Sequence, residues 1–314
     1  MKIAITGGTG FIGQHLAAHL QAHECELVLL SRRGEPLPQA IPGGHSVRLV
    51  SADLSDVAVL ADAFAGCHAV AHCAGINREL GPQTYKRIHV EGTSNVVAAC
   101  SAARVPKIVF MSFLRARPDC GSAYHESKWQ AEEIVRNSGL DYTILKSGMV
   151  YGRGDHMLDH LSHSFFTFPF LPTVGLREKA IRPVTIDDLT EVMAAAIQDG
   201  RLSRKTLAVT GAEELLLSEA ALRVANVVGR KIVVFPIPVA LHYIFAYFFE
   251  LTMKVPLAAR AQVRILSEGV VDAAPPCDAL PPDLLPARSF TAEQIRKGLP
   301  DPGRFRLKDL RCCA

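Results

Sequence analysis

A glycine-rich turn that joins an apolar strand to an amphipathic helix constrains the fold of this chain more than any other feature. Residues 1–6 are predicted to form the strand, Gly7, Gly10 and Gly13 follow with the spacing GxxGxxG, and apolar residues recur at helical spacing over 16–20. In such a unit the glycines permit a tight turn, approach of a pyrophosphate to the backbone, and close packing of helix on strand. The helix N-terminus adds N–H groups and a positive dipole end. Because strand and helix are both present, the turn predicts a dinucleotide site rather than an ordinary loop.

The end of the second predicted strand, 26–30, indicates which dinucleotide is bound. NAD-selective domains usually place Asp or Glu about 20 residues past the glycines, where it bonds the ribose 2′-hydroxyl. In this chain the strand is followed by Arg32 and Arg33. Two guanidinium groups suit the 2′-phosphate of NADP through bidentate, charge-assisted contacts. We therefore expect NADP in preference to NAD, and two merely solvated arginines are the alternative.

Further contacts with the dinucleotide are expected from the turn and from the end of the third predicted strand, 46–50. Asp53 and Leu54 follow that strand, at the place where such folds contact adenine. An alternative is that Asp53 only caps a helix that begins near Ser55. The residues expected to contact the dinucleotide at the turn are Gly7, Thr9, Gly10, Phe11, Ile12 and Gly13.

Strand and helix patterns alternate along the first half of the chain, which predicts an α/β fold with a doubly wound parallel sheet. Further strands are expected at 69–75, 107–112 and 142–145, and helices at 94–103 and 129–137. After residue 150 the pattern loosens. We expect a nucleotide-binding Rossmann domain over 1–150 and a smaller substrate lobe over 151–314, part of which returns to the sheet. A proline-rich tail at 275–286 is expected to lack regular structure.

Composition allows this architecture and disfavours other classes. The chain has 314 residues, 49% of them hydrophobic, enough for a large α/β domain with an appended lobe. A net charge of +3 is too small to indicate a nucleic-acid partner. The eight cysteines form no CxxC pair, which favours reduced thiols and a cytoplasmic setting. Histidines cluster at 15–23 and 156–163, but packed or solvated side chains are the favoured interpretation and we predict no metal site.

A tyrosine and a lysine four residues apart supply the candidate chemistry. On a helix, Tyr124 and Lys128 lie on one face. The ammonium is expected to lower the pKa of the phenol, which can then pass a proton to or from a carbonyl or hydroxyl beside the nicotinamide. Ser112, at the end of a predicted strand and twelve residues before Tyr124, is expected to hold the substrate oxygen. The spacing is common by chance, but its place behind the glycine turn strengthens it.

These motifs resemble those of the atypical and extended short-chain dehydrogenase/reductases. Nearly the whole chain is similar to bacterial relatives of the nucleotide-binding accessory subunit of mitochondrial complex I. The segments that carry the likeness are 6–13, 72–75, 92–96, 124–128, 132–146, 150–155, 182–189, 209–213 and 235–238. The resemblance implies that Cys73, Ala74, Gly75 and Lys128 also contact the cofactor. It implies no particular substrate, because the group contains enzymes and non-catalytic members.

Two positions depart from the pattern of that family. His89 stands where the family often has an asparagine that organises a proton relay. Lys146-Ser147 stands where the family usually has Arg-Pro after the sixth strand. Tyr124 and Lys128 are retained, so catalysis and inheritance of the fold without turnover both stay open.

Residues 232–251 form a strongly apolar run that is interrupted by Pro236 and Pro238. A transmembrane helix needs ~20 apolar residues, and the helical part after the prolines is only about twelve residues long, which is short for spanning. The run is predicted either to pack in the second lobe or to form a surface that accepts a lipophilic, quinone-like substrate or docks on a membrane. Lys254 and Arg260 just beyond it fit contact with anionic lipid. Such contact would place the protein at the inner face of a membrane.

Three functions follow from these features. The leading hypothesis is an NADP-dependent oxidoreductase that transfers a hydride to or from a carbonyl or alcohol carbon of a lipophilic substrate. The second is a non-catalytic protein that holds NADP(H) as a structural or sensing ligand and helps to assemble a respiratory or quinone-synthesis complex. The third is a nucleotide-sugar epimerase or dehydratase, which needs a polar lobe to bind the sugar, whereas the second lobe of this chain is strongly apolar.

Overall fold

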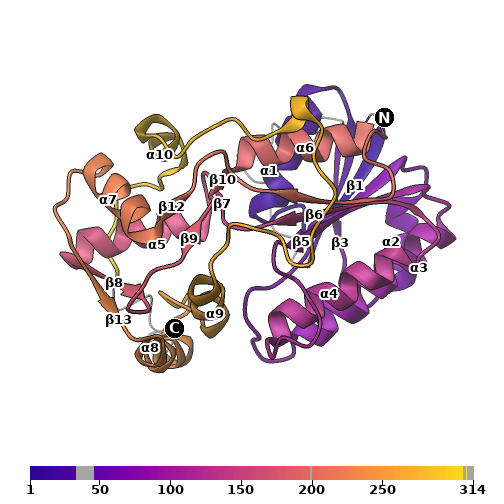
Figure 1. The fold of residues 1–314 in the computed structure, drawn as a ribbon. Helices are drawn as coiled ribbons and strands as arrows, with labels where there is room; N and C mark the ends of the chain where they lie inside the picture. The colour runs from indigo at the N-terminus through magenta and orange to yellow at the C-terminus, as the bar shows by residue number, and fades with distance from the viewer. Residues whose placement is uncertain (33–45, 199, 307–308, 310–314) are drawn as a thin grey trace. The chain divides into compact units, whose positions relative to one another are not determined.

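A parallel sheet of seven strands is the largest sheet of the computed structural model, which describes residues 1–32, 46–198, 200–306 and 309 (Figure 1). The strand order is β11-β6-β5-β4-β1-β2-β3, and every neighbouring pair is parallel. The doubly wound α/β fold predicted from the sequence is confirmed. The strands are β1 (Lys2–Thr6), β2 (Glu26–Ser31), β3 (Val47–Ser51), β4 (Ala69–His72), β5 (Lys107–Phe113), β6 (Asp141–Ser147) and β11 (Lys205–Val209).

Helices cover both faces of this sheet. α1 packs against α6 on one face, and α2, α3 and α4 pack in sequence on the other (Figure 1). Both faces are therefore dry, and all seven residues of β5 and all four of β4 are buried. The helices are α1 (Phe11–Ala22), α2 (Val57–Phe64), the π-helix η1 (Lys86–Glu91) that runs directly into α3 (Gly92–Ala102), α4 (Ala123–Arg136) and α6 (Ile186–Gln198).

The order of the strands reverses between β1 and β4. In open α/β sheets, ligands bind outside the carboxyl ends of the strands at such a switch point. The glycine turn follows β1, and residues 73–75 follow β4, so the sheet brings two of the predicted cofactor segments to this place.

Close backbone contacts explain the glycines of the turn. Gly7 has φ +68°, and a Cβ atom on it would lie 2.9 Å from the Cα of Ala74. A Cβ on Gly13 would meet the carbonyl oxygen of Gly7 and lie 2.9 Å from the Cα of Gly8. The N–H of Gly10 donates to the carbonyl of Gly7 (2.9 Å), and α1 then begins at Phe11 without a side-chain cap.

Contacts between residues divide the chain into two units. Unit 1 consists of Met1–Ser147, Ile186–Val209 and Asp272–Leu285, and unit 2 of Gly148–Thr185, Thr210–Val271 and Pro286–Ala314. After residues 148–185 of unit 2, the chain thus returns to unit 1, where it forms α6 and the edge strand β11. The segment 272–285 lies along β11, where the N–H of Asp278 donates to the carbonyl of Thr206 (2.8 Å). Its one described helix is the short 3-10 turn Pro282–Leu284.

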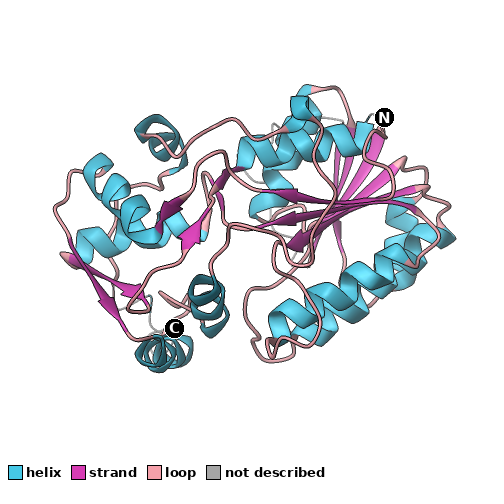
Figure 2. Cartoon of the chain, viewed as in Figure 1, coloured by secondary structure: helices cyan, strands magenta, loops and turns pink. Residues whose placement is uncertain are grey.

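Unit 2 is built from helices and three small pairs of strands (Figure 2). The apolar run at 232–251 contains a strand as well as a helix, and Pro238 separates them. Among the helices of the described residues, none is long and apolar enough to cross a membrane. The elements of unit 2 are β7 (Val150–Tyr151), α5 (His156–Thr167), β8 (Phe170–Val174), β9 (Ala180–Ile181), β10 (Val184–Thr185), β12 (Leu215–Leu216), α7 (Leu217–Val227), β13 (Val233–Ile237), α8 (Val239–Thr252), α9 (Arg260–Glu268) and α10 (Ala292–Gly298).

Capping residues move two helix starts away from their predicted places. Ser122 caps α4 through the N–H of His125, so this helix begins at Ala123 and includes Tyr124 in its first turn. Asp56, not Asp53, caps α2 by accepting from the N–H of Val59 (3.1 Å). The alternative that Asp53 serves as the helix cap is therefore wrong.

The turn predicts a difference between two Gly→Ala variants. Gly13→Ala should lower the free energy of unfolding by about 1–3 kcal/mol, because its Cβ overlaps backbone that cannot move without breaking the turn. Gly10→Ala is the matched control, since Gly10 has φ −75° and its Cβ would have one backbone neighbour, at 3.2 Å. Urea denaturation without nucleotide measures both. Equal losses for the two variants would contradict the close packing of Gly13 on the turn.

Candidate functional site

The loop after β4 joins the glycine turn to the helix that carries Tyr124 and Lys128. The N–H of Cys73 donates to the carbonyl of Thr6 (3.1 Å), which holds the start of the loop on β1. A Cβ on Gly75 would lie 3.4 Å from Lys128 Nζ and 3.5 Å from His89 Nε2. The structure thus brings together three of the sequence-predicted segments in unit 1, namely the turn, residues 73–75 and Lys128.

Lys128 is buried with its ammonium turned toward strand β5. Nζ donates to the carbonyl of Met111 (3.0 Å) and lies 5.2 Å from the centroid of the Phe110 ring. Burial lowers the pKa of Lys128 to about 8, although the carboxylate of Glu132 opposes the shift. Loss of hydration is therefore the dominant influence on this charge.

Burial also dominates at Tyr124. Its pKa is raised to about 12, because the phenolate would lose hydration. The direction is opposite to the one expected from the lysine ammonium alone. The ring is enclosed by aromatic neighbours, with ring centroids at 5.4 Å for Phe113, 5.6 Å for Tyr85, 5.7 Å for His89 and 5.9 Å for His125.

His89 ties the loop after β4 to α4. Its Nε2 accepts from the N–H of Ile76 (3.1 Å), so the proton of the neutral ring lies on Nδ1. Nδ1 then donates to Ser127 Oγ (2.9 Å), which in turn donates to the carbonyl of Tyr124 (2.9 Å). Burial holds the pKa of His89 well below its usual range. The histidine that replaces the family's asparagine therefore positions the backbone at Tyr124.

A second buried histidine supports this arrangement, and the sequence analysis did not single it out. Thr93 Oγ1 donates to the carbonyl of His89 (2.5 Å) and so accepts from His72 Nε2 (3.0 Å). The other nitrogen of His72 accepts from Thr6 Oγ1 (2.6 Å). Burial lowers the pKa of His72 to about 3, so the ring is neutral. A histidine inside an otherwise apolar strand is the signal that could have found this line of hydrogen bonds.

Ser112 belongs to a buried ion network. Its hydroxyl donates to Glu132 Oε1 (2.5 Å), and the same carboxylate pairs with Lys146 (3.1 Å) and Arg136 (2.7 Å). Glu132 and Lys146 have 0% and 1% of their side chains exposed, so this pair is internal, whereas the Arg136 side chain is 21% exposed. The hydroxyl expected to hold a substrate oxygen is committed to Glu132, and the ring of the next residue, Phe113, faces Tyr124 instead.

The same network accounts for Lys146, which stands where the family usually has arginine. Its ammonium donates to the carbonyl of Ala116 (2.7 Å) and neutralises Glu132. Burial lowers the pKa of Lys146, and Glu132 opposes that shift. A buried carboxylate of this kind is stable only while paired, so Lys146 is needed for Glu132 to be buried between β6 and α4.

The predicted adenine and 2′-phosphate contacts lie at the ends of β2 and β3. Arg32 is exposed directly after β2, whereas Arg33 lies outside the described residues. Asp53 Oδ1 accepts from the N–H of Ser55 (2.9 Å) and lies 3.6 Å from Arg87. That backbone hydrogen bond, aided by Arg87 and Arg32, lowers the pKa of Asp53. Arg87 is thus a further cation beside Asp53, which the sequence analysis missed.

Leu54 is buried beneath the same corner. Its carbonyl accepts from Asn95 Nδ2 (2.9 Å), and a Cβ on Gly92 would lie 2.8 Å from Leu54 Cδ1. The side chain thus packs against the start of α3.

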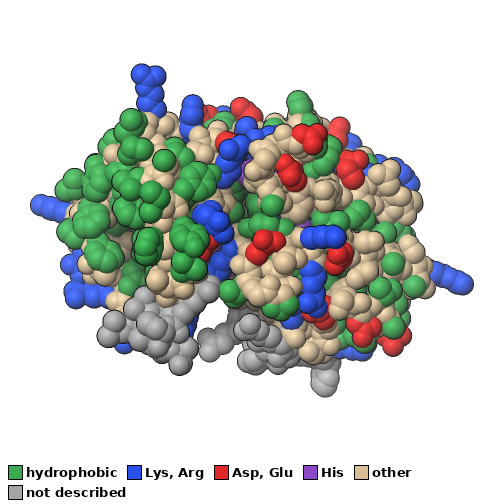
Figure 3. Space-filling view, turned by 90° about the horizontal axis from the view of Figure 1, so that it is seen from below, with side chains coloured by type: hydrophobic (Ala, Val, Ile, Leu, Met, Phe, Trp, Pro, Cys, Tyr) green, Lys and Arg blue, Asp and Glu red, His purple; other side chains and the backbone are tan. Residues whose placement is uncertain are grey.

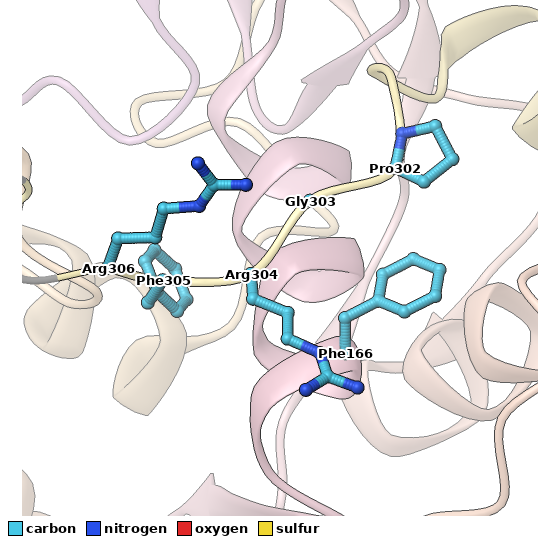
Figure 4. A pocket seen from close by; sticks show the side chains of 6 residues that line it. All are labelled: Phe166, Pro302, Gly303, Arg304, Phe305 and Arg306. Atoms are coloured by element: carbon cyan, nitrogen blue, oxygen red, sulfur yellow. The ribbon is translucent and has the colours of Figure 1, made fainter.

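Unit 2 has a surface hollow of its own, of about 430 Å³, which contains no residue of the predicted site (Figure 4). Among the described residues, no three His, Cys, Asp or Glu side chains are grouped so that they could hold a metal ion. The residues that line the hollow are Phe166, Pro302, Gly303, Arg304, Phe305 and Arg306.

Comparison with known proteins agrees with this geometry. Residues 7–161 match the family described as NAD(P)H-binding. The UDP-glucose 4-epimerase of Thermus thermophilus, solved with NAD, superposes with a TM-score of 0.71 over 95% of this chain and 97% of that one, at 21% identity. At this identity the likeness concerns the fold alone. The chain therefore has a Rossmann fold whose residues 7–161 match an NAD(P)H-binding domain, and it resembles the short-chain dehydrogenase/reductases.

Curated relatives extend the likeness beyond the family match. An uncharacterized protein of Mycobacterium tuberculosis is 26% identical over 82% of this chain, which spans only 27% of that protein's length. The ceramide reductase of Caulobacter vibrioides is 25% identical over 73% of this chain and 71% of its own. Subunit 9 of the NADH dehydrogenase (ubiquinone) 1 alpha subcomplex of Mus musculus, a mitochondrial protein, is 22% identical over 82% of this chain and 70% of its own. The resemblance to complex I accessory subunits is therefore confirmed.

The network around Ser112 predicts a stability effect in place of a catalytic one. Ser112→Ala removes a donor from a buried carboxylate and should lower the free energy of unfolding by about 1–3 kcal/mol, with nucleotide affinity unchanged. Ser101→Ala is the control, because Ser101 lies on α3 and donates only locally, to the carbonyl of Val97. Unaltered stability together with loss of turnover would instead return Ser112 to the role of substrate-oxygen holder.

Proposed function

We propose that the protein is an NADP(H)-dependent reductase or dehydrogenase that acts on a carbonyl or hydroxyl group of a lipophilic substrate. The observation that carries the proposal is the pairing of Tyr124 with Lys128 on the first turns of α4. There Lys128 lies beside Gly75, in the loop that also contacts the glycine turn.

The residues at the turn fit a dinucleotide. Glycines at 7, 10 and 13 leave backbone room, and the start of α1 has no side-chain acceptor to occupy its first N–H groups. Arg32 and Arg87 supply positive charge beside Asp53, which supports NADP as the preferred form. Residues 73–75 and Lys128 would border the other end of the molecule.

In the proposed reaction Tyr124 donates a proton to the carbonyl oxygen of the substrate. A bound nicotinamide supplies or accepts the hydride. A phenol with a pKa of about 12 is protonated at neutral pH, as a proton donor must be. Lys128, with a pKa of about 8, is one helical turn away and can return a proton to the phenol. The aromatic rings around Tyr124 would limit the access of water to this transfer.

Two observations support a lipophilic substrate. The relative from Caulobacter vibrioides is named for a lipid, ceramide. Unit 2 also exposes many large apolar side chains, including Phe170, Phe235 and Phe248. A nucleotide-sugar substrate is less favoured, because the sugar-nucleotide epimerases share only the fold with this chain.

A second candidate function is a non-catalytic NADP(H)-binding protein that helps to assemble a larger complex. The hydroxyl of Ser112 donates to Glu132, and the ring of Phe113 lies beside Tyr124 instead. The serine hydroxyl that was expected to hold the substrate oxygen next to the Tyr124 phenol is therefore engaged elsewhere. The likeness to the complex I subunit supports the same role.

Replacement of the phenol separates the two candidates. Tyr124→Phe should lower kcat for a long-chain 3-oxo ester by about 100-fold or more while the Kd for NADPH stays unchanged. Loss of NADPH absorbance with ethyl 3-oxododecanoate in micelles measures the first quantity and fluorescence titration the second. Tyr85→Phe is the matched control, since this neighbouring phenol donates to the carbonyl of Asn77 (2.9 Å). Turnover in Tyr124→Phe equal to that of the wild type would refute Tyr124 as the proton donor, and a wild type without turnover would favour the non-catalytic candidate.

Cofactor choice is tested by charge reversal at Arg32. Arg32→Glu should weaken NADPH binding by about tenfold or more and leave NADH binding nearly unchanged, because only NADPH carries the 2′-phosphate. Arg48→Glu is the control, as Arg48 is exposed on the adjacent strand β3. Parallel loss of both nucleotides in Arg32→Glu, or of neither, would contradict the assignment of Arg32 to the phosphate.

A further inference from the structure

Helix α8 of unit 2 turns its apolar stripe away from the fold. Leu241, Ile244, Phe245, Phe248 and Leu251 recur at helical spacing, and each has between 37% and 60% of its surface exposed. The two residues of α8 that are buried are His242 and Ala246. Surface helices normally turn such a stripe toward the core, so the exposed stripe of α8 departs from the usual arrangement.

The neighbouring strands enlarge this face. β8 and β13 pair in parallel, with Phe170 opposite Val233. Phe168 and Phe170 have ring centroids 5.7 Å apart, Phe170 and Phe235 6.2 Å apart, and all three rings are exposed. Figure 3 shows hydrophobic side chains gathered over this part of unit 2. We call the patch the apolar face; its members are Phe168, Phe170, Val233, Phe235, Leu241, Ile244, Phe245, Tyr247, Phe248 and Leu251.

Positive charge flanks the apolar face. Residues 230–271 contain five Lys and Arg but two Glu, a net of +3. Both carboxylates are neutralised, because Glu250 pairs with Arg260 (2.8 Å) and Glu268 with Arg264 (2.5 Å).

Two arginines lie against aromatic rings of this part of unit 2. Arg260 lies 5.8 Å from the ring of Tyr247, and Arg230 lies 4.8 Å from the ring of Phe166. Phe166 also lines the hollow that contains Arg304 and Arg306 (Figure 4).

We propose that the apolar face docks unit 2 on the surface of an anionic phospholipid bilayer. Exposed Phe, Tyr, Leu and Ile would enter the boundary between headgroups and acyl chains, and the basic residues would meet lipid phosphates. With 14 residues, α8 is about 21 Å long, shorter than the ~30 Å hydrocarbon core, so it lies in the interface and does not cross it. The proposal goes beyond the proposed reaction and does not depend on it.

Charge favours a bilayer over a second copy of the chain as the occupant. A symmetric dimer through the apolar face would bring two identical basic flanks together, since both subunits contribute the same surface. Anionic headgroups would instead neutralise these flanks.

Flotation with vesicles tests the proposal on the full chain. The wild type should float with vesicles of phosphatidylcholine and phosphatidylglycerol in equal parts, and bind about tenfold or more weakly to pure phosphatidylcholine or at high salt. Phe245→Ser with Phe248→Ser should weaken binding to the anionic vesicles by about tenfold or more, because two large apolar side chains are lost. Leu222→Ser is the matched control, as Leu222 is 43% exposed on α7 but lies outside the apolar face.

An unchanged circular dichroism spectrum and an unchanged midpoint of thermal unfolding establish that the double variant is folded. The proposal is overturned if the wild type fails to float with the anionic vesicles, or if the double variant floats as well as the wild type. It is also overturned if light scattering finds a dimer that the double variant converts to a monomer, because the apolar face would then be an interface between copies.

Discussion

The approach of three backbone segments at the switch point of the sheet is the constraint on which the site depends. Gly7 lies against Ala74, and Gly13 against Gly8, at separations that leave no room for a Cβ atom. The start of α1, the end of β1 and the loop after β4 are therefore held as one body without side chains between them. Every group further along that loop, including Gly75 beside Lys128, takes its position from this contact.

Strand β5 is bound to α4 through both polar and aromatic contacts. The carbonyl of Met111 binds the ammonium of Lys128, the hydroxyl of Ser112 enters the Glu132 network, and the ring of Phe113 packs on Tyr124. Three successive residues of β5 thus contact α4 in three ways, through a backbone carbonyl, a hydroxyl and an aromatic ring. The buried ion network and the aromatic contact together hold β5 against α4.

The sequence predicted the fold because glycine spacing and alternating patterns are local signals. It predicted the Tyr124–Lys128 pair for the same reason, since both residues lie one turn apart on one helix. It did not predict the partner of Ser112, because Glu132 is twenty residues away and only packing of α4 on β5 brings them together.

Other errors have a similar physical cause. The direction of the pKa shift at Tyr124 follows from burial, which is a property of the packed structure. Asp53 and Asp56 both lie near the start of α2, and the residue types alone do not show which of them caps the helix. For the run that contains α8, the sequence left open whether it packs in the second lobe or forms a surface, because periodicity identifies a face but not what lies opposite it.

The buried histidines have a consequence for the whole molecule in acid. His72 stays neutral in the fold with a pKa of about 3, whereas an unfolded chain would protonate it near its ordinary value of 6.5. Below pH 6.5 the unfolded chain binds a proton at His72 that the native protein does not bind. The free energy of unfolding therefore falls as the pH is lowered from 6.5 toward 3. The line from Thr6 through His72 to Thr93 thus makes the dinucleotide half of the protein sensitive to acid, although it carries no charge itself.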